Sequence, residues 1–177
     1  MSTYANFQEM LAETKLAGDR ACALILAANI DNRLRDLLAA FFVEMSNNQK
    51  DALFKGNGAL STFSSVTRVA FASGLLSNDE FNDINIIRDI RNLFAHQEQG
   101  WSFSTTKVVQ LCSSLKMPTT LRAEHPELAP RVQLPRASFE VAAASLVLLL
   151  MNRVDEASRS KRTVHVPTSI LPRRSSE

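Results

Sequence analysis

The stretch from Arg91 to His96 places a guanidinium, an amide and an imidazole within two turns of one predicted helix. Arginine offers a planar fork of donors that suits phosphate, and histidine is the side chain whose unperturbed pKa lies nearest neutrality. This combination suits cleavage of RNA without a metal ion. His96 would move a proton at the 2′-hydroxyl or the leaving 5′-oxygen, while Arg91 would hold the scissile phosphate. Asn92 would orient the imidazole or the phosphate.

A second interpretation gives the same residues a structural role. His96 would interact with the last carbonyl groups of the helix, which contributes about 0.3–1 kcal/mol at an exposed site. Arg88 and Arg91 would pair with Asp89 or with carboxylates of another helix. Arg91 and His96 differ by roughly 140° around a regular helix axis, so one helix does not direct both at one small target. Two copies that meet across a two-fold axis, or a distorted last turn, would do so, and the geometry therefore favours a homodimer over a monomer for catalysis by this pair.

The helix that carries these residues has clear signals at both ends. Ser77 and Glu80 have the spacing of a capping box, and Gly100 follows the predicted end near residue 96. Apolar residues recur after the cap at helical spacing, which predicts a buried stripe. They are Phe81, Ile84, Ile87, Ile90 and Phe94.

The remaining apolar periodicity also predicts helices, and no segment shows the alternation of a strand. The segments 3–17, 19–45, 61–73, 105–115 and 136–158 are the other predicted helices. Four prolines within 116–135 predict a long irregular segment there, and Ser46, Asn47 and Asn48 predict a break after the long helix. We therefore expect one all-α domain over residues 1–158, a helical bundle with the helix 19–45 at its centre.

The charge of the chain is divided unevenly. Residues 159–177 hold five basic residues and one acidic residue, hence +4, whereas the whole chain carries +2, which leaves −2 for residues 1–158. The segment 159–177 has no apolar face and is predicted to be a disordered basic tail. A domain that binds DNA unaided normally presents a basic face. The net charge of −2 on residues 1–158 therefore argues against unaided DNA binding.

Composition argues against several other classes. Cys22 and Cys112 lie far apart in apolar stretches, so we expect reduced thiols and a cytoplasmic protein. No His, Cys, Asp or Glu spacing suggests a metal site, no glycine loop suggests a cofactor, and the start of the chain lacks a secretory pattern. The longest apolar run, 141–151, is too short to span a membrane and predicts a buried helix. Segments 61–73 and 78–96 could form a helix-turn-helix, but the acidic residues at the start of the second segment would be repelled by DNA phosphates.

Several stretches, in order and with similar spacing, resemble one known family. They are residues 58–63 (GALSTF), 72–76 (ASGLL), 78–81 (NDEF) and 90–96 (IRNLFAH). Over about residues 20–115 the chain resembles the mannitol operon repressor (MtlR) family. That resemblance implies an all-helical protein with a role in negative regulation of transcription and without an evident DNA-binding motif. The basic tail and the proline-rich segment depart from the family pattern.

A shorter resemblance concerns Arg91, Asn92 and His96 alone. Their spacing is similar to the Arg-x4–6-His signature of HEPN-type ribonucleases, in which a dimer brings two motifs together. The resemblances leave two hypotheses. The first is a regulator without enzymatic activity that acts as a homodimer, through a protein partner or a nucleic-acid complex. The second is a metal-independent endoribonuclease with Arg91 and His96 as catalytic residues and Asn92 in support.

Overall fold

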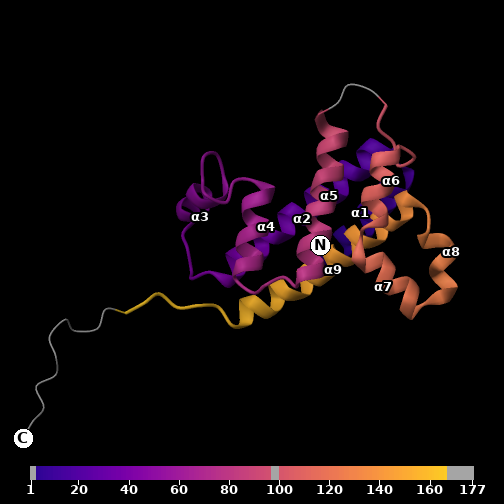
Figure 1. Ribbon diagram of the computed structural model, residues 1–177. Coiled ribbons are helices and arrows are strands. Elements are labelled where there is room, and N and C mark those ends of the chain that lie inside the picture. The colour runs from indigo at the N-terminus through magenta and orange to yellow at the C-terminus, as the bar shows by residue number, and fades with distance from the viewer. Residues whose placement is uncertain (1–2, 97–99, 167–177) are drawn as a thin grey trace, which may run out of the picture.

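The computed structural model describes residues 3–96 and 100–166, and within them the secondary structure is entirely helical (Figure 1). This confirms the predicted all-α fold class. The helices are α1 (Thr3–Leu16), α2 (Asp19–Phe41), α3 (Asn47–Phe54), α4 (Phe63–Ala72), α5 (Asn78–His96), α6 (Thr106–Ser113), α7 (Lys116–Glu124), α8 (Ala129–Val132) and α9 (Pro135–Arg159), with a short 3-10 turn at Pro126–Leu128.

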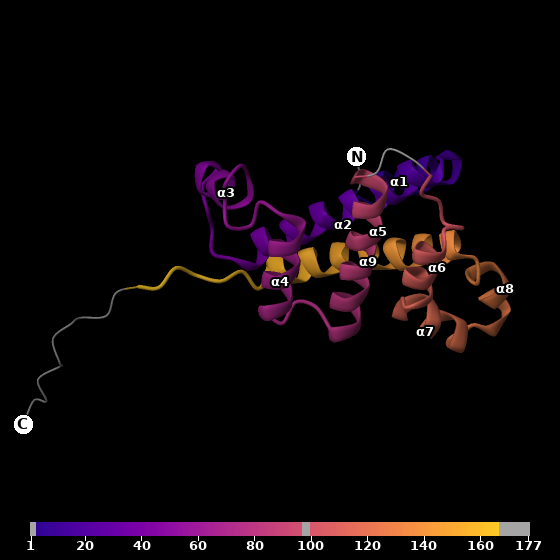
Figure 2. The same ribbon diagram turned by 45° about the horizontal axis from the view of Figure 1, so that its top comes forward.

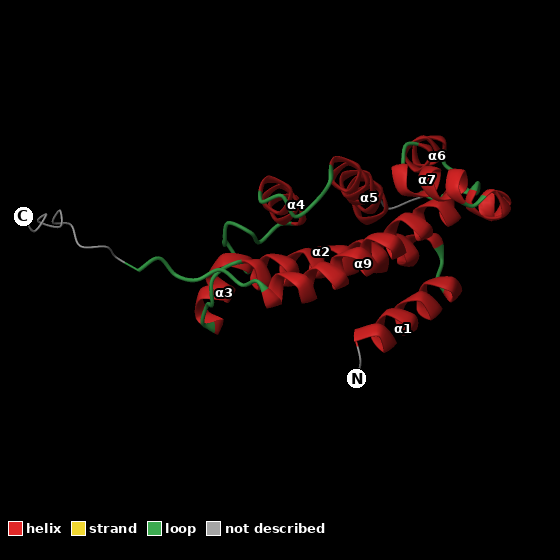
Figure 3. Ribbon diagram, turned by 90° about the horizontal axis from the view of Figure 1, so that it is seen from below, coloured by secondary structure: helices red, strands yellow, loops and turns green. Residues whose placement is uncertain are grey.

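The centre of the fold is a pair of long helices, α2 and α9, which run side by side in the same direction (Figure 3). At one end of the pair, Arg136 Nη1 lies 3.0 Å from Asp19 Oδ1. At the other end, Lys161, just after α9, pairs with Glu44, just after α2. Contacts at both ends thus fix the register of two helices that are far apart in the sequence.

The other helices cover this pair in layers. Helices α4, α5, α6 and α7 lie over one face, and α1 lies over the opposite face (Figures 2 and 3). The predicted apolar stripe of α5 faces the pair, because Ile84, Ile87 and Ile90 are fully buried. Phe94 continues this core through Phe103 to Phe139 of α9, with ring centroids 5.4 and 5.2 Å apart.

Helix α9 has the length and hydropathy of a membrane span, but it serves as a core helix. One side of it is packed against α2 and α5. Its buried apolar side chains include Ala142, Ala143, Leu146, Val147 and Leu150. The prediction of a buried helix over residues 141–151 is therefore confirmed on that side.

The helix predicted over 19–45 is shorter than expected, and a helix that the sequence did not predict follows it. The backbone of Phe42 is extended, with φ −69° and ψ 170°, so α2 ends at Phe41. Ser46 then begins α3 through a capping box, because Gln49 N–H donates to its hydroxyl while Ser46 N–H donates to Gln49 Oε1. The Ser-Asn-Asn sequence is thus a start signal as well as a break.

The prediction of an irregular segment over 116–135 is wrong, since α7, a 3-10 turn and α8 occupy most of it. Pro118 is tolerated because it lies in the first turn of α7, where its missing N–H costs no intrahelical bond. The start of α7 is capped from another helix. Asp83 of α5 accepts the backbone N–H groups of Lys116 and Met117 at 2.8 and 2.9 Å.

The predicted tail begins at the observed end of α9, which is Arg159. Its first residues form no helix, and the Arg162 guanidinium lies 4.2 Å from the centroid of the Phe41 ring. A guanidinium over an aromatic face is an attractive contact. Together with the Lys161–Glu44 pair, it places the start of the tail against the end of α2. Residues 167–177 lie outside the described part of the chain.

Candidate functional site

The orientation of α5 is fixed at its first turn. The predicted capping box is confirmed, because Ser77 N–H donates to Glu80 Oε2 at 2.7 Å and Glu80 N–H donates to Ser77 Oγ at 3.3 Å. Arg153 of α9 binds the same carboxylate. With the first turn held and the isoleucine stripe buried, the polar side of α5 turns toward α4 and the outer side of α2.

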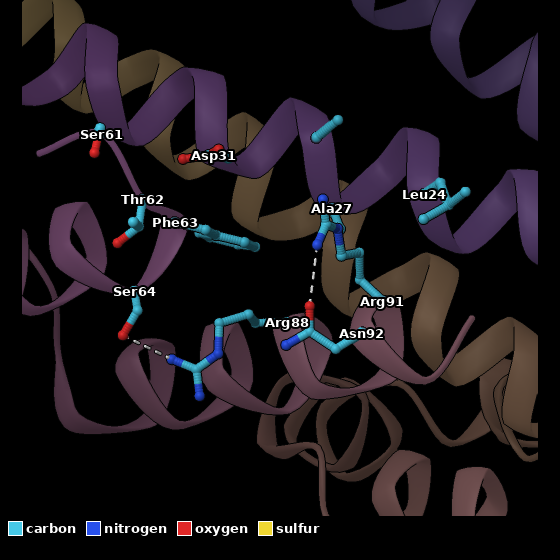
Figure 4. A pocket seen from close by; sticks show the side chains of 11 residues that line it. Leu24, Ala27, Asp31, Ser61, Thr62, Phe63, Ser64, Arg88, Arg91 and Asn92 are labelled. Atoms are coloured by element: carbon cyan, nitrogen blue, oxygen red, sulfur yellow. Dashed lines mark hydrogen bonds between the residues drawn. The ribbon is translucent and has the colours of Figure 1, made fainter. Parts of the chain in front are cut away.

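On that side, α2, α4 and α5 enclose a cleft of about 700 Å³ (Figure 4). Helix α5 supplies Arg88, Arg91 and Asn92, which include two of the three predicted site residues. The other walls come from α2 and from the start of α4. The complete lining is Leu24, Ala27, Ala28, Asp31, Ser61, Thr62, Phe63, Ser64, Arg88, Arg91 and Asn92.

Arg88 is held in place by several acceptors. Its Nη1 donates to Asn85 Oδ1 at 2.8 Å and to Ser64 Oγ at 3.3 Å, which joins α5 to α4. Its Nη2 donates to Asp89 Oδ1 at 3.1 Å. The predicted pairing of Arg88 with Asp89 is therefore confirmed. Because Asp89 is more exposed than Arg88, this pair neutralises the guanidinium only in part.

Arg91 has a different environment. Its Nη1 donates to Asn92 Oδ1 at 3.0 Å, and its side chain runs toward α2 near Ala27 (Figure 4). Among residues 3–96 and 100–166, no carboxylate forms an ion pair with Arg91. The prediction that Arg91 pairs with an acid is therefore wrong for this part of the chain. Arg91 is an exposed cation at the cleft, and among the described residues only the Asn92 oxygen accepts a hydrogen bond from it.

The first turn of α4 forms another wall. Thr62 is the N-cap and makes a capping box with Ser65, whose N–H donates to Thr62 Oγ1 at 3.0 Å. The backbone N–H groups of Phe63 and Ser64 make no hydrogen bond within the described residues. Such free N–H groups give a helix start a partial positive charge.

Arg35 of α2 holds this turn in position. It donates to the carbonyl oxygens of Leu60 at 2.7 Å and Ser61 at 3.0 Å. It also donates to Asp31 Oδ2 at 3.2 Å. The other oxygen of Asp31 lies 3.1 Å from the same nitrogen, but it makes no hydrogen bond and is shielded from solvent. The negative charge of Asp31, which lines the cleft, is thus neutralised by Arg35, which does not line it.

The outcome for the three predicted site residues is mixed. The structure brings Arg91 and Asn92 together in the lining of the cleft. His96 is the last residue of α5, and its side chain lies outside the described part of the chain. A catalytic role for these residues stays a prediction. The described residues contain no grouping of His, Cys, Asp and Glu that could hold a metal ion.

Sequence reasoning missed two of the three walls of the cleft. The apolar positions of α2 and the start of α4 are far from α5 in sequence, so no motif on α5 indicates them. One local signal was available: the run from Ser61 to Ser65 follows a glycine turn and precedes an apolar helix, which is typical of a helix start.

Comparisons with known proteins agree with the fold. The family described as mannitol repressor matches residues 13–147. Among curated proteins, none matches this chain. The structure is similar to that of YggD from Shigella flexneri, described as a possible transcriptional regulator, with a TM-score of 0.63, 16% identity, and coverage of 89% of this chain and 99% of that chain.

A second similar structure is that of the MtlR–HPr complex from Escherichia coli. Its TM-score is 0.58 at 16% identity, and the match covers 87% of this chain and 99% of that chain. At identities this low, the structural similarity shows a common fold and nothing more. The family match, which spans most of the chain, agrees with the predicted resemblance over about residues 20–115. The protein belongs to the mannitol repressor family.

Proposed function

We propose that this protein is a cytoplasmic transcriptional repressor that acts through a protein partner and not by binding DNA unaided. The observation that carries this proposal is the relative solved in complex with a second protein, HPr. That relative shares the fold over nearly its whole length. The family match supports the regulatory part of the proposal.

The charge of the domain supports a partner-mediated mechanism. Residues 1–158 carry a net charge of −2, whereas neutralising DNA phosphates requires many basic side chains on one face. The start of α5 is also unsuited to enter a DNA groove. Glu80 and Asp83 are both buried there and are used to bind α9 and α7. A recognition helix needs its first turns free to contact bases.

A binding comparison tests this proposal. Fluorescence anisotropy would be measured for labelled HPr and for labelled duplex DNA from the region upstream of the gene that encodes this protein. Each would be titrated with the full chain at physiological salt. We expect saturable binding of HPr and only weak, salt-sensitive binding of DNA. A control variant carries Gln in place of the five basic residues of 159–177, and it should lose the residual DNA binding but keep HPr binding. Tight, sequence-specific DNA binding without any partner would refute the proposal.

A metal-independent ribonuclease remains the second candidate, because Arg91 and Asn92 meet at a cleft with a second arginine. The spacing of Arg91 and His96 on one helix favours a dimer for this activity. The test is incubation of the wild type and of His96→Ala with labelled tRNA in EDTA, together with light scattering to give the oligomeric state. Cleavage that the substitution abolishes, by a dimer, would establish the ribonuclease. Intact RNA with both proteins would reject it.

A further inference from the structure

We propose that the cleft between α2, α4 and α5 binds a small metabolite that carries a phosphomonoester and hydroxyl groups. The phosphate would lie between Arg88, Arg91 and the first turn of α4. This inference goes beyond the proposed function, which requires no small ligand.

The first argument is that two arginines line one small volume. Arg88 and Arg91 come from adjacent turns of α5. The Arg88 guanidinium reaches to Ser64 and the Arg91 side chain runs toward α2, so the two cations flank the cleft (Figure 4). Arg88 is positioned by Asn85 and Ser64, so its ordering costs little when a ligand binds. Arg91 has only the Asn92 oxygen as a described partner and keeps donors for an incoming anion. Arginine forks match phosphate oxygens geometrically.

The second argument is the backbone at the start of α4. The N–H groups of Phe63 and Ser64 are unused within the described residues, and both residues line the same cleft as the arginines. Free N–H groups at a helix start favour anions. The Ser64 hydroxyl already accepts a hydrogen bond from Arg88, so a phosphate here would contact both helices at their junction.

The third argument concerns what surrounds the phosphate position. The Phe63 ring points into the space between Asp31 and Arg88 (Figure 4), where it offers an apolar surface for carbon atoms. Asp31 also lines the cleft, and a ligand hydroxyl that displaces the groups shielding its Oδ1 would give that oxygen the hydrogen bond it lacks. The hydroxyls of Ser61 and Thr62 add further polar groups to this wall.

Size and charge favour a small ligand over a nucleic acid. The volume of about 700 Å³ lies within the range of small-molecule pockets. A nucleic acid would need a basic track leading away from the cleft, whereas the domain as a whole is slightly acidic. A phosphorylated sugar or polyol matches a cleft with cations at one side and a carboxylate at the other.

Calorimetry with the full chain tests the proposal, with glucose 6-phosphate, glycerol 3-phosphate, inorganic phosphate and glucose as probes. We expect at least one phosphorylated probe to bind with a Kd of about 1 mM or tighter. Inorganic phosphate should bind more weakly, because it leaves Phe63 and Asp31 unused, and glucose should not bind. Arg91→Ala should weaken binding by about ten-fold or more, because it removes a charge-assisted contact from an exposed position that does not support the fold.

The matched control is Arg68→Ala, which removes an exposed arginine of α4 that does not line the cleft. It should leave affinity unchanged. Arg88→Lys keeps the charge but loses the fork, and thermal melts would verify that it folds; it should weaken binding as Arg91→Ala does.

Three outcomes overturn the proposal. One is no binding of any phosphorylated probe, and another is equal loss of affinity in Arg68→Ala and Arg91→Ala. The third is Arg91-dependent binding of an RNA oligonucleotide that phosphorylated sugars do not displace, which would assign the cleft to nucleic acid. None of these outcomes changes the HPr measurement, so failure here leaves the proposed function separately testable.

Discussion

Arg153 of α9 binds both carboxylate oxygens of Glu80 on α5, with Nη2 2.7 Å from Oε1 and Nη1 2.8 Å from Oε2. The same guanidinium donates to the carbonyl oxygen of Leu75 at 3.1 Å. Glu80 is in turn the N3 residue of the capping box of α5. One ion pair therefore joins the start of α5, the turn before it and the core helix α9.

Replacing Arg153 by Met should lower the free energy of unfolding by about 2–3 kcal/mol, because Glu80 would remain buried with its charge unpaired. The partial exposure of Arg153 keeps the loss below that of a fully buried pair. Urea denaturation measures it. Glu80→Gln combined with Arg153→Met should cost less than the sum of the two single changes, and strict additivity would show that the pair does not couple.

The wild type should lose stability at pH values below the usual pKa of a glutamate, which is about 4.3. Burial alone would raise the pKa of Glu80, but hydrogen bonds from Arg153 and Ser77 outweigh it and hold that pKa below its usual range. A depressed pKa in the folded state means that the stabilisation is present above the unfolded value and is lost as the pH falls through the folded value. Urea midpoints between pH 7 and pH 3 should therefore decline less steeply for Glu80→Gln. Equal slopes of urea midpoint against pH for the wild type and Glu80→Gln would contradict this prediction.

Asp83→Asn should loosen the start of α7. The fully buried carboxylate accepts two backbone N–H groups, whereas an amide presents one acceptor and one donor to them. One N–H loses its partner, at about 1–3 kcal/mol. Hydrogen exchange at Lys116 and Met117 should accelerate, and Asp79→Asn, an exposed neighbour, should leave it unchanged.

The pH dependence of Asp83 is opposite to that of Glu80. Burial raises the pKa of Asp83 above its usual range, although the backbone donors of α7 favour the ionised form. The folded state then binds this proton more tightly than the unfolded state does. The wild type should therefore gain stability relative to Asp83→Asn as the pH falls through the raised value. A constant difference between the two proteins across pH would disprove this assignment.

Both cysteine thiols should resist modification in the folded protein. Burial raises the pKa of Cys22 to about 12, with the nearby Glu140 carboxylate adding to the shift, and burial raises the pKa of Cys112 to about 12 as well. At pH 8 the thiolate fraction is on the order of one in ten thousand. A chromogenic disulfide reagent should react slowly without denaturant and rapidly in urea. Ser158→Cys introduces a thiol at an exposed position and should add one rapidly reacting thiol per chain. Rapid reaction of the wild type without denaturant would contradict the burial of its two thiols.

Much of the fold was predictable because its signals are local. Apolar periodicity and the Ser77–Glu80 capping box predicted α5 at the observed position, and Gly74, with φ +73°, ends α4 as expected. The errors came from polar or proline-rich sequence. Segment 116–135 forms helices because Asp83, from a distant part of the chain, caps the first of them. Local helix propensity cannot predict this contact, because Asp83 lies more than 30 residues before α7 in the sequence.

The candidate site was only half predictable for a similar reason. Arg91 and Asn92 were identified from their residue types, and the structure places both at the cleft. Its other walls depend on how α2 and α4 approach α5, which Arg35 controls through carbonyl oxygens of the α3–α4 connection. Backbone carbonyl acceptors carry no sequence signature, so this contact was invisible until the fold was known.

The parallel pairing of α2 and α9 has a consequence for biosynthesis. Cys22 and Glu140, which meet in this pair, are 118 positions apart. During translation, α2 leaves the ribosome long before the helix that covers it, so its row of leucines stays without its native partner while most of the chain is made. Contacts between such distant segments also slow folding after release. The nascent chain is thus a natural client for a chaperone that shields apolar helices, and premature termination before α9 should yield an aggregating fragment and not a smaller folded protein.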